Sequence, residues 1–236
     1  MTARVLIVTT SHGVMNDGTL TGLWAEELAT PYYALRDAGF GATLASIGGG
    51  PIPFDPLGVK AADPLPRSVE RLLADRAAMQ LVQITPGVDE IDPAGFAAIY
   101  LPGGHGALWD MPGSAALAAR LSWFDAAGRP IAASCHGPAG LLGATRRDGQ
   151  PLVANRRLCA FTRAEEDRVG RAGAVPFLLE DRLRSQGAQF SAGAHFQPHA
   201  IRDGNLITAQ NPASSEKLSA LLLQALTETA KAQAAA

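Results

Sequence analysis

Short apolar runs alternate along the chain with longer stretches whose apolar residues recur every three or four positions. The runs contain many β-branched and small residues, which is typical of buried strands. They cover residues 4–11, 42–48, 96–104, 129–135, 158–162, 188–193 and 205–210. The periodic stretches predict helices over residues 21–40, 68–82, 114–128, 136–144, 175–187 and 211–229.

The first and last of these helices carry additional signals. The apolar face of the last one follows the i, i+3, i+4, i+7, i+8 pattern, with Asn211 as the expected cap and Pro212 in the first position. That face consists of Leu218, Leu221, Leu222, Ala225 and Leu226. Pro31 lies inside the first helix, where its ring clashes with the carbonyl of Glu27. We therefore expect either a kink or a second helix that begins with Thr30 as its cap.

Strands and helices in alternation predict βαβ units in a single α/β domain over residues 1–236. The expected architecture is a three-layer sandwich, with a mostly parallel sheet and helices on both of its faces. Residues 48–92 begin with a Gly- and Pro-rich segment before the helix that Ser68 is expected to cap. We interpret them as a small lid-like insertion, and a plain surface excursion is the alternative. Ligands bind outside the carboxyl ends of parallel strands, which directs attention to the ends of 96–104 and 129–135.

Composition and charge narrow the range of partners. Hydrophobic residues make up 47% of the chain, and 20 basic against 22 acidic residues leave a net charge of -2. No basic footprint indicates binding to nucleic acid or to an anionic membrane. The first residues lack the features of a secretory signal, and no apolar run approaches the ~18 residues that span a bilayer. We expect a soluble, cytoplasmic protein.

The segment Ala133-Ser134-Cys135-His136-Gly137 is the strongest chemical signal. It follows an apolar strand and resembles a nucleophile elbow, in which small residues permit a sharp turn that presents the nucleophile at the edge of the sheet. A helix that begins directly after the turn would favour the thiolate, so we expect the pKa of the Cys135 thiol to be lowered. His136 is the candidate base. The second cysteine, Cys159, is expected to be a buried structural residue.

The glycine-rich segment 101–106 follows the neighbouring strand. Its backbone can approach a developing negative charge closely, as in an oxyanion hole. The N–H groups of Gly104 and His136 are the candidate donors.

Other polar and aromatic residues give weaker signals. His195 and His199 have the i, i+4 spacing of metal ligands, but Pro198 between them disfavours a helix, so we expect no metal there. His12 is expected to be a loop residue. Four aromatic residues are either pocket walls or core, namely Trp24, Tyr32, Tyr33 and Phe54. No phosphate-binding loop occurs, and no cofactor is expected.

Five segments in order, YLPGGHG, AASCHGPAGLL, FT-x-x-EE, VPFLLED and NPASS, resemble the ThiJ/PfpI superfamily, to which the parkinsonism-associated deglycase belongs. The resemblance runs from residue 4 to about residue 226. It is strongest to the branch of glutathione-independent glyoxalases (glyoxalase III) and heat-shock chaperones. It implies a flavodoxin-like fold and a homodimer.

The resemblance also implies roles for particular residues. Cys135 corresponds to the nucleophile, His136 to its base, and Glu27 to the acid that precedes a proline by four residues. The third triad member corresponds to Glu166, with Glu165 as the near alternative. A carboxylate beside a thiolate raises the pKa of both groups, so Glu27 is expected to act in its protonated form.

The implied activity is conversion of methylglyoxal and other small 2-oxoaldehydes to lactate and other 2-hydroxy acids, the reaction named D-lactate dehydratase in reverse. It proceeds through a hemithioacetal on Cys135 and needs neither metal nor glutathione. A stress-responsive holdase chaperone and a thiol-dependent deglycase or hydrolase are the alternatives. Glutamine amidotransferases share the fold, but they use a His-x-Glu pair that this chain lacks.

Overall fold

The computed structural model describes residues 3–60 and 64–234, and its centre is a six-stranded sheet with the order β2-β1-β3-β4-β8-β7. Neighbouring strands run parallel except β7, which is antiparallel to β8. The strands are β1 (Arg4–Thr9), β2 (Gly41–Ser46), β3 (Ala98–Leu101), β4 (Ile131–Ser134), β7 (Ala200–Asp203) and β8 (Leu206–Ala209). A separate parallel pair consists of β5 (Arg157–Leu158) and β6 (Gln189–Phe190).

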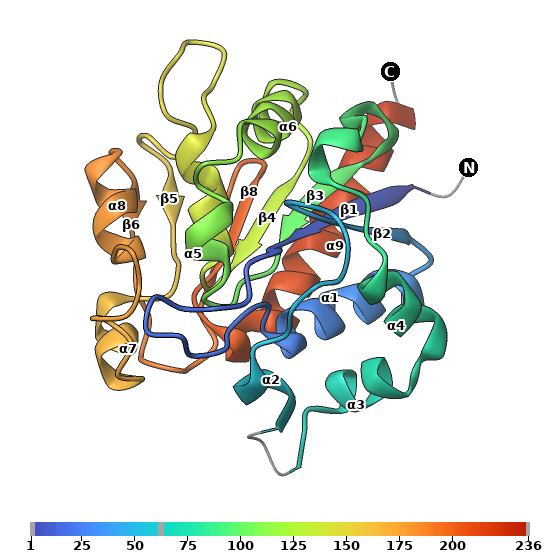
Figure 1. Ribbon diagram of the computed structural model, residues 1–236. Coiled ribbons are helices and arrows are strands. Elements are labelled where there is room, and N and C mark those ends of the chain that lie inside the picture. The colour runs from blue at the N-terminus through green and yellow to red at the C-terminus, as the bar shows by residue number, and fades with distance from the viewer. Residues whose placement is uncertain (1–2, 61–63, 235–236) are drawn as a thin grey trace.

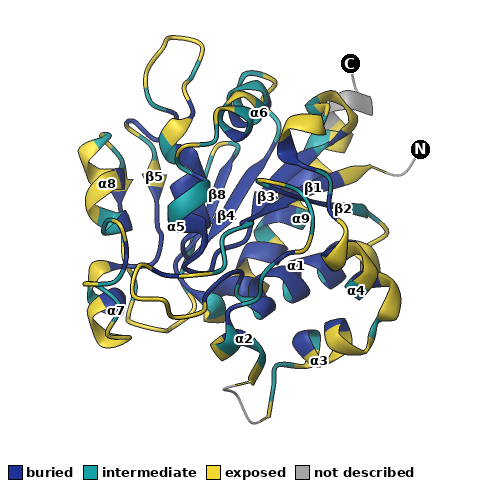
Figure 2. Cartoon of the chain, viewed as in Figure 1, coloured by how far each residue is buried: buried dark blue, intermediate teal, exposed yellow. Residues whose placement is uncertain are grey.

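Helices cover both faces of the sheet (Figure 1). One face packs against α1 (Ala25–Asp37) and α9 (Ser215–Ala234), and the other against α6 (Ala115–Ala126), while α8 (Leu179–Ser185) packs against β6 on the same side. Along β1, Val5 and Ile7 face the first layer, whereas Leu6 and Val8 face the second. This period of two in a strand buried on both sides confirms the predicted flavodoxin-like sandwich. The inner strands β3, β4 and β8 are fully buried, and most exposed residues lie on the outer helices and loops (Figure 2).

Several predicted elements are shorter or differently formed in the structure. The predicted strands 158–162 and 188–193 contribute only the residues of β5 and β6, and β7 was not predicted. The predicted helix 136–144 is a 3-10 helix, η3 (Gly137–Gly143), and the last helix starts with the 3-10 turn η4 (Pro212–Ser214). The short helices α5 (Ala107–Asp110) and α7 (Arg163–Arg168) were also missed. They are too short to show a period in the sequence.

Pro31 does not break α1, which is continuous through it. A proline has no N–H for the carbonyl four residues earlier, so the carbonyl of Glu27 is left without its helical partner. That carbonyl instead accepts a hydrogen bond from Tyr100 Oη on β3, at 2.6 Å. Thr30 is therefore a helix residue and not a cap, and its hydroxyl lies 2.7 Å from that of Ser68.

The insertion over residues 48–92, of which 61–63 lie outside the described residues, contains α2 (Pro56–Lys60), α3 (Arg67–Ala74) and α4 (Arg76–Gln83). The helix predicted over 68–82 is two helices, because Asp75 ends α3 and caps α4 by accepting from the N–H of Ala78. Ser68 is not the cap, since α3 begins after Pro66. α3 packs against α1, away from the carboxyl ends of the strands (Figure 1).

The insertion leads back to β3 through the 3-10 turns η1 (Val88–Glu90) and η2 (Pro93–Gly95). Within residues 3–60 and 64–234, no helix combines the length and apolar character needed to cross a bilayer.

Candidate active site

Cys135 lies at the carboxyl end of β4, in the turn that leads into η3. Its backbone has φ 54°, a left-handed conformation that is costly for a residue with a side chain. Two hydrogen bonds hold it there: its N–H donates to Ala209 O at 2.8 Å, and its carbonyl accepts from Phe161 N at 2.9 Å. A Cβ at Gly137 would lie 2.1 Å from Leu101 O, so the turn requires glycine there. This is the geometry of a nucleophile elbow.

The Cys135 thiol is paired with an imidazole and a carboxylate. Its Sγ lies 3.2 Å from His136 Nδ1, and His136 Nε2 lies 2.9 Å from Glu166 Oε2. An ionised carboxylate only accepts hydrogen bonds, so the ring proton of His136 is on Nε2 and Nδ1 is free to accept the thiol proton. The arrangement is a Cys-His-Glu triad.

Of the two adjacent glutamates on α7, Glu166 is the one that contacts His136. Burial raises its pKa, but the proximity of His136 and hydrogen bonds from His105 and His136 outweigh burial and hold the pKa of Glu166 far below its usual range.

Glu165 is also buried and points away from the triad. Its Oε1 accepts from Phe196 N, Gln210 Nε2 and Asn211 Nδ2, while its Oε2 accepts from the N–H and hydroxyl of Thr162. With every lone pair in use, Glu165 holds together the loops on this side of the cavity.

Glu27 reaches the thiol from the first turns of α1 and is fully buried. Its Oε2 accepts from Gly103 N at 2.7 Å and Ser134 Oγ at 2.8 Å, whereas Oε1 has no partner among the described residues. Burial is the largest influence on its pKa and raises it above the usual carboxyl range. An unpartnered buried oxygen and a raised pKa both fit a carboxyl that carries a proton on Oε1.

The expectation of a lowered thiol pKa is wrong for this structure. Cys135 is 4% exposed, and burial raises its pKa well above the usual value. The residues after it form a 3-10 helix, so the helix terminus that was expected to favour the thiolate is weak. The surroundings therefore do not favour a thiolate at Cys135, and the neighbouring atom that can accept its proton is His136 Nδ1.

Gly104 and His136, the candidate oxyanion donors, both line the cavity above Cys135. Gly104 has φ +106°, and a Cβ there would lie 2.2 Å from Gly22 O. Across residues 3–60 and 64–234, neither backbone N–H of the two donates to another protein group. Both are thus free to bind an oxygen of a ligand.

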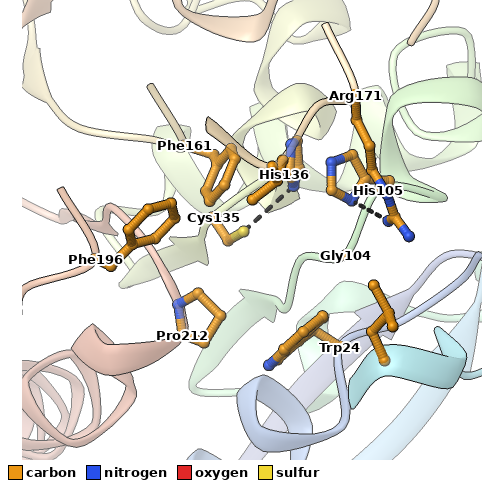
Figure 3. A pocket seen from close by; sticks show the side chains of 11 residues that line it. Trp24, Gly104, His105, Cys135, His136, Phe161, Arg171, Phe196 and Pro212 are labelled. Carbon is orange, nitrogen blue, oxygen red and sulfur yellow. Dashed lines mark hydrogen bonds between the residues drawn. The ribbon is translucent and has the colours of Figure 1, made fainter. Parts of the chain in front are cut away.

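Cys135 forms part of the wall of an apolar cavity of about 170 Å³ (Figure 3). Its apolar walls are Trp24, Leu57, Phe161, Val169, Phe196 and Pro212. Of the aromatic residues that the sequence suggested, Trp24 lines this cavity, whereas Tyr32 and Tyr33 belong to the core between α1 and its neighbours. Phe54 packs against the same core, and His12 stacks on Trp109. Among the described residues of the insertion, Leu57 is the one that lines the cavity.

Two polar residues of the site, His105 and Arg171, were not predicted from the sequence. His105 Nε2 lies 2.7 Å from Glu166 Oε1, and Arg171 Nη1 lies 3.0 Å from His105 Nδ1. His105 belongs to the segment 101–106, which attracted attention only for its glycines. Arg171 follows α7 and carries no signal in the sequence, because the fold alone brings it to β3.

A metal could be held by one group of side chains among the described residues, His105, His136 and Glu166, whose ligand atoms lie within 4.8 Å of one another. The hydrogen bonds just described already account for this grouping.

Residues 19–225 match the model of the DJ-1/PfpI family. The chain belongs to the DJ-1/PfpI family. The family match spans all the residues of the triad as well as Glu27, and the recognition made from the sequence is confirmed.

Relatives within the DJ-1/PfpI family include named enzymes. The protein/nucleic acid deglycase HchA of Pseudomonas aeruginosa is 28% identical over 95% of this chain and 81% of its own. The glutathione-independent glyoxalase HSP31 of Saccharomyces cerevisiae is 28% identical over 94% of this chain and 98% of its own. Among solved structures, the Rapid Encystment Protein 24 KDa of Francisella tularensis superposes with a TM-score of 0.91 at 35% identity, over 95% of this chain and 99% of the other.

Proposed function

We propose that the protein is a glutathione-independent glyoxalase that converts methylglyoxal and related small 2-oxoaldehydes to 2-hydroxy acids. The observation that supports this best is the surrounding of Cys135. The Cys135 thiol lies beside a base and near the buried carboxyl of Glu27, whose pKa is raised, at the wall of a small apolar cavity. The reaction needs one nucleophile and two groups that exchange protons, and these three supply them.

The first step forms a bond between Sγ of Cys135 and the aldehyde carbon. His136 Nδ1 takes the thiol proton as the carbon–oxygen double bond opens. The resulting oxyanion faces the N–H groups of Gly104 and His136 and then receives the proton, which yields a hemithioacetal.

The second step moves a hydrogen from the former aldehyde carbon to the neighbouring carbonyl carbon through an enediol. His136 and Glu27 exchange the protons that this requires. The first carbon is oxidised to a thioester as the second is reduced to an alcohol, so the redox change stays within the substrate. Water then cleaves the thioester, releases the 2-hydroxy acid and restores the thiol.

The test is formation of lactate from methylglyoxal by the purified protein without added thiol. The alternatives predict different results. A deglycase would release free amines or guanidines from glycated peptides faster than it consumes free methylglyoxal. A holdase would suppress aggregation of an unfolded client equally well as Cys135→Ala, with no aldehyde turnover.

Exposed apolar side chains at the mouth of the cavity are the observation that favours testing the holdase alternative. Three cavity-lining residues, Leu57, Val169 and Phe196, are between 42% and 49% exposed, so apolar surface reaches the outside at the mouth of the cavity. Exposed apolar surface of this kind either admits a small ligand or contacts another chain.

A further inference from the structure

A line of charged and polar side chains continues from Glu166 away from the thiol. Arg171 Nη1 donates to His105 Nδ1 at 3.0 Å and to Asp55 Oδ2 at 2.9 Å. Asp55 is fully buried, and its oxygens also accept from Thr21 Oγ1 and Leu57 N, both at 3.0 Å. Each member of the line therefore has a defined partner, which buried charged groups require.

The position of Arg171 determines the proton on His105. A guanidinium can only donate, so His105 Nδ1 must offer its lone pair, and the ring proton is on Nε2. That proton points to Glu166 Oε1, at 2.7 Å. The second oxygen of Glu166 is left for His136. The two histidine rings lie with centroids 4.2 Å apart, one on each oxygen of the same carboxylate.

We propose that Arg171, held by Asp55, sets the tautomer of His105 and so keeps Glu166 ionised and turned toward His136. Asp55, Arg171 and His105 are then positioning residues for the Cys135 thiol. The inference rests on the proposed function only in taking Cys135 as the reacting group, and it holds for any electrophile.

The charges around His105 agree with this role. Burial and then the charge of His136 lower its pKa to about 4, and Glu166 and Arg171 are the other charged groups that face it. His105 thus stays neutral at physiological pH. A neutral His105 can donate a hydrogen bond to Glu166 and still leave the negative charge of that carboxylate to stabilise a proton on His136. The charged and titratable groups that face Cys135 are Glu27, Glu165, Glu166 and His136.

The same tautomer works against metal binding. A metal at His105, His136 and Glu166 would need the lone pair of His105 Nε2, which carries the proton as long as Arg171 donates to Nδ1. Removal of the guanidinium would release that constraint. Arg171 therefore favours the proposed catalytic arrangement of these side chains over an alternative in which they bind zinc and block the thiol.

The first experiment measures alkylation of Cys135 by iodoacetamide between pH 5 and 10, followed by peptide mass spectrometry. In Arg171→Met and His105→Leu we expect the apparent pKa of Cys135 to rise by about one unit, with an about tenfold lower rate at neutral pH. Arg171→Lys and His105→Gln, which keep a donor, should recover most of the rate.

Asp125→Asn is the matched control. It breaks another largely buried Arg–Asp pair, Arg156–Asp125 at 2.9 Å, which lies apart from the site, and should leave the profile unchanged. Unchanged profiles in Arg171→Met and His105→Leu, or an equal shift in Asp125→Asn, would overturn the proposal.

The tautomer of His105 in the wild-type protein and the zinc sensitivity of the variants provide two further tests. Nitrogen NMR of histidine-labelled wild-type protein should show His105 protonated on Nε2 only, and a proton on Nδ1 at neutral pH would contradict the proposal. Zinc should inhibit alkylation at an at least about tenfold lower concentration in Arg171→Met than in the wild type, but not in His105→Leu, which lacks a ligand. Equal zinc sensitivity of wild type and Arg171→Met would also contradict it. None of these measurements needs the aldehyde, so failure of the glyoxalase proposal would be seen separately.

Discussion

Cys135 and Cys159 are both buried, but their chemical surroundings differ. They are 4% and 0% exposed, and burial raises the pKa of both thiols, that of Cys159 to about 12. Cys159 Sγ lies 3.3 Å from Thr208 O and 3.8 Å from His199 O, which accept a hydrogen bond but take no proton at neutral pH. Cys135 instead lies beside an imidazole, in a strained turn at a cavity. Burial alone therefore does not distinguish a reactive thiol from a structural one, whereas a neighbour that can accept its proton does.

The largest expected difference is in turnover after removal of each thiol. Cys135→Ala should reduce lactate formation from methylglyoxal to the uncatalysed background. Cys159→Ala should keep activity within about twofold and lose about 1–2 kcal/mol of unfolding free energy, the usual range for a small buried truncation. Product assays and urea denaturation of both variants test this. Retained turnover in Cys135→Ala would remove the basis of the proposed mechanism.

The next largest effect is the loss of activity expected when Glu27, the carboxyl beside Cys135, is replaced. Glu27→Gln keeps the size of the side chain but cannot release a proton, and we expect kcat/KM to fall about 10²–10⁴-fold, the range for a lost acid–base group. Glu26→Gln, one residue away on the same helix, is the matched control and should keep its activity. Equal losses of kcat/KM in the two variants would show that the activity depends on the integrity of helix α1 and not on the proton of Glu27.

The rates of oxidation of the two cysteines should differ by a smaller factor. With dilute peroxide we expect Cys135 to reach the sulfinate at least about tenfold faster than Cys159, because His136 can take its proton and the cavity admits the oxidant. Mass spectrometry of the two peptides over time measures both rates. Faster modification of Cys159 would show that the elbow does not activate its thiol.

The smallest effect is on stability and belongs to Glu26. Burial, and then the neighbouring carboxyl groups of Glu27 and Glu216, raise its pKa from 4.5 to about 7. Because the folded value is the higher one, ionisation is easier in the unfolded chain, and the unfolding free energy falls as the pH rises between these two values. Glu26→Gln should match the wild type near pH 4 and be about 1–2 kcal/mol more stable at pH 8, after allowance for solvent screening. Denaturant curves at the two pH values test this. A difference that is the same at both would assign the effect to a cause other than ionisation.

Parts of the site could be recognised from sequence because they are contiguous. Cys135 and His136 are neighbours at a strand end, and the small residues around them are those that a sharp turn requires. Glu27 and Glu166 were found through the family resemblance, since nothing local separates Glu27 from Glu26 or Glu166 from Glu165. His105 and Arg171 were not found, because their partners are 61 and 116 residues away along the chain.

The amino-acid sequence by itself determined the order of the main strands and helices and the position of the elbow, because periodicity and small-residue turns are local properties of the chain. The tertiary structure alone decided which groups carry protons. Protonation depends on how completely each group is removed from water and on which charges meet it, and the sheet brings those charges together from β3, β4, α1 and α7. For this reason the direction in which the pKa of Cys135 shifts could be learned only from its surroundings in the folded protein.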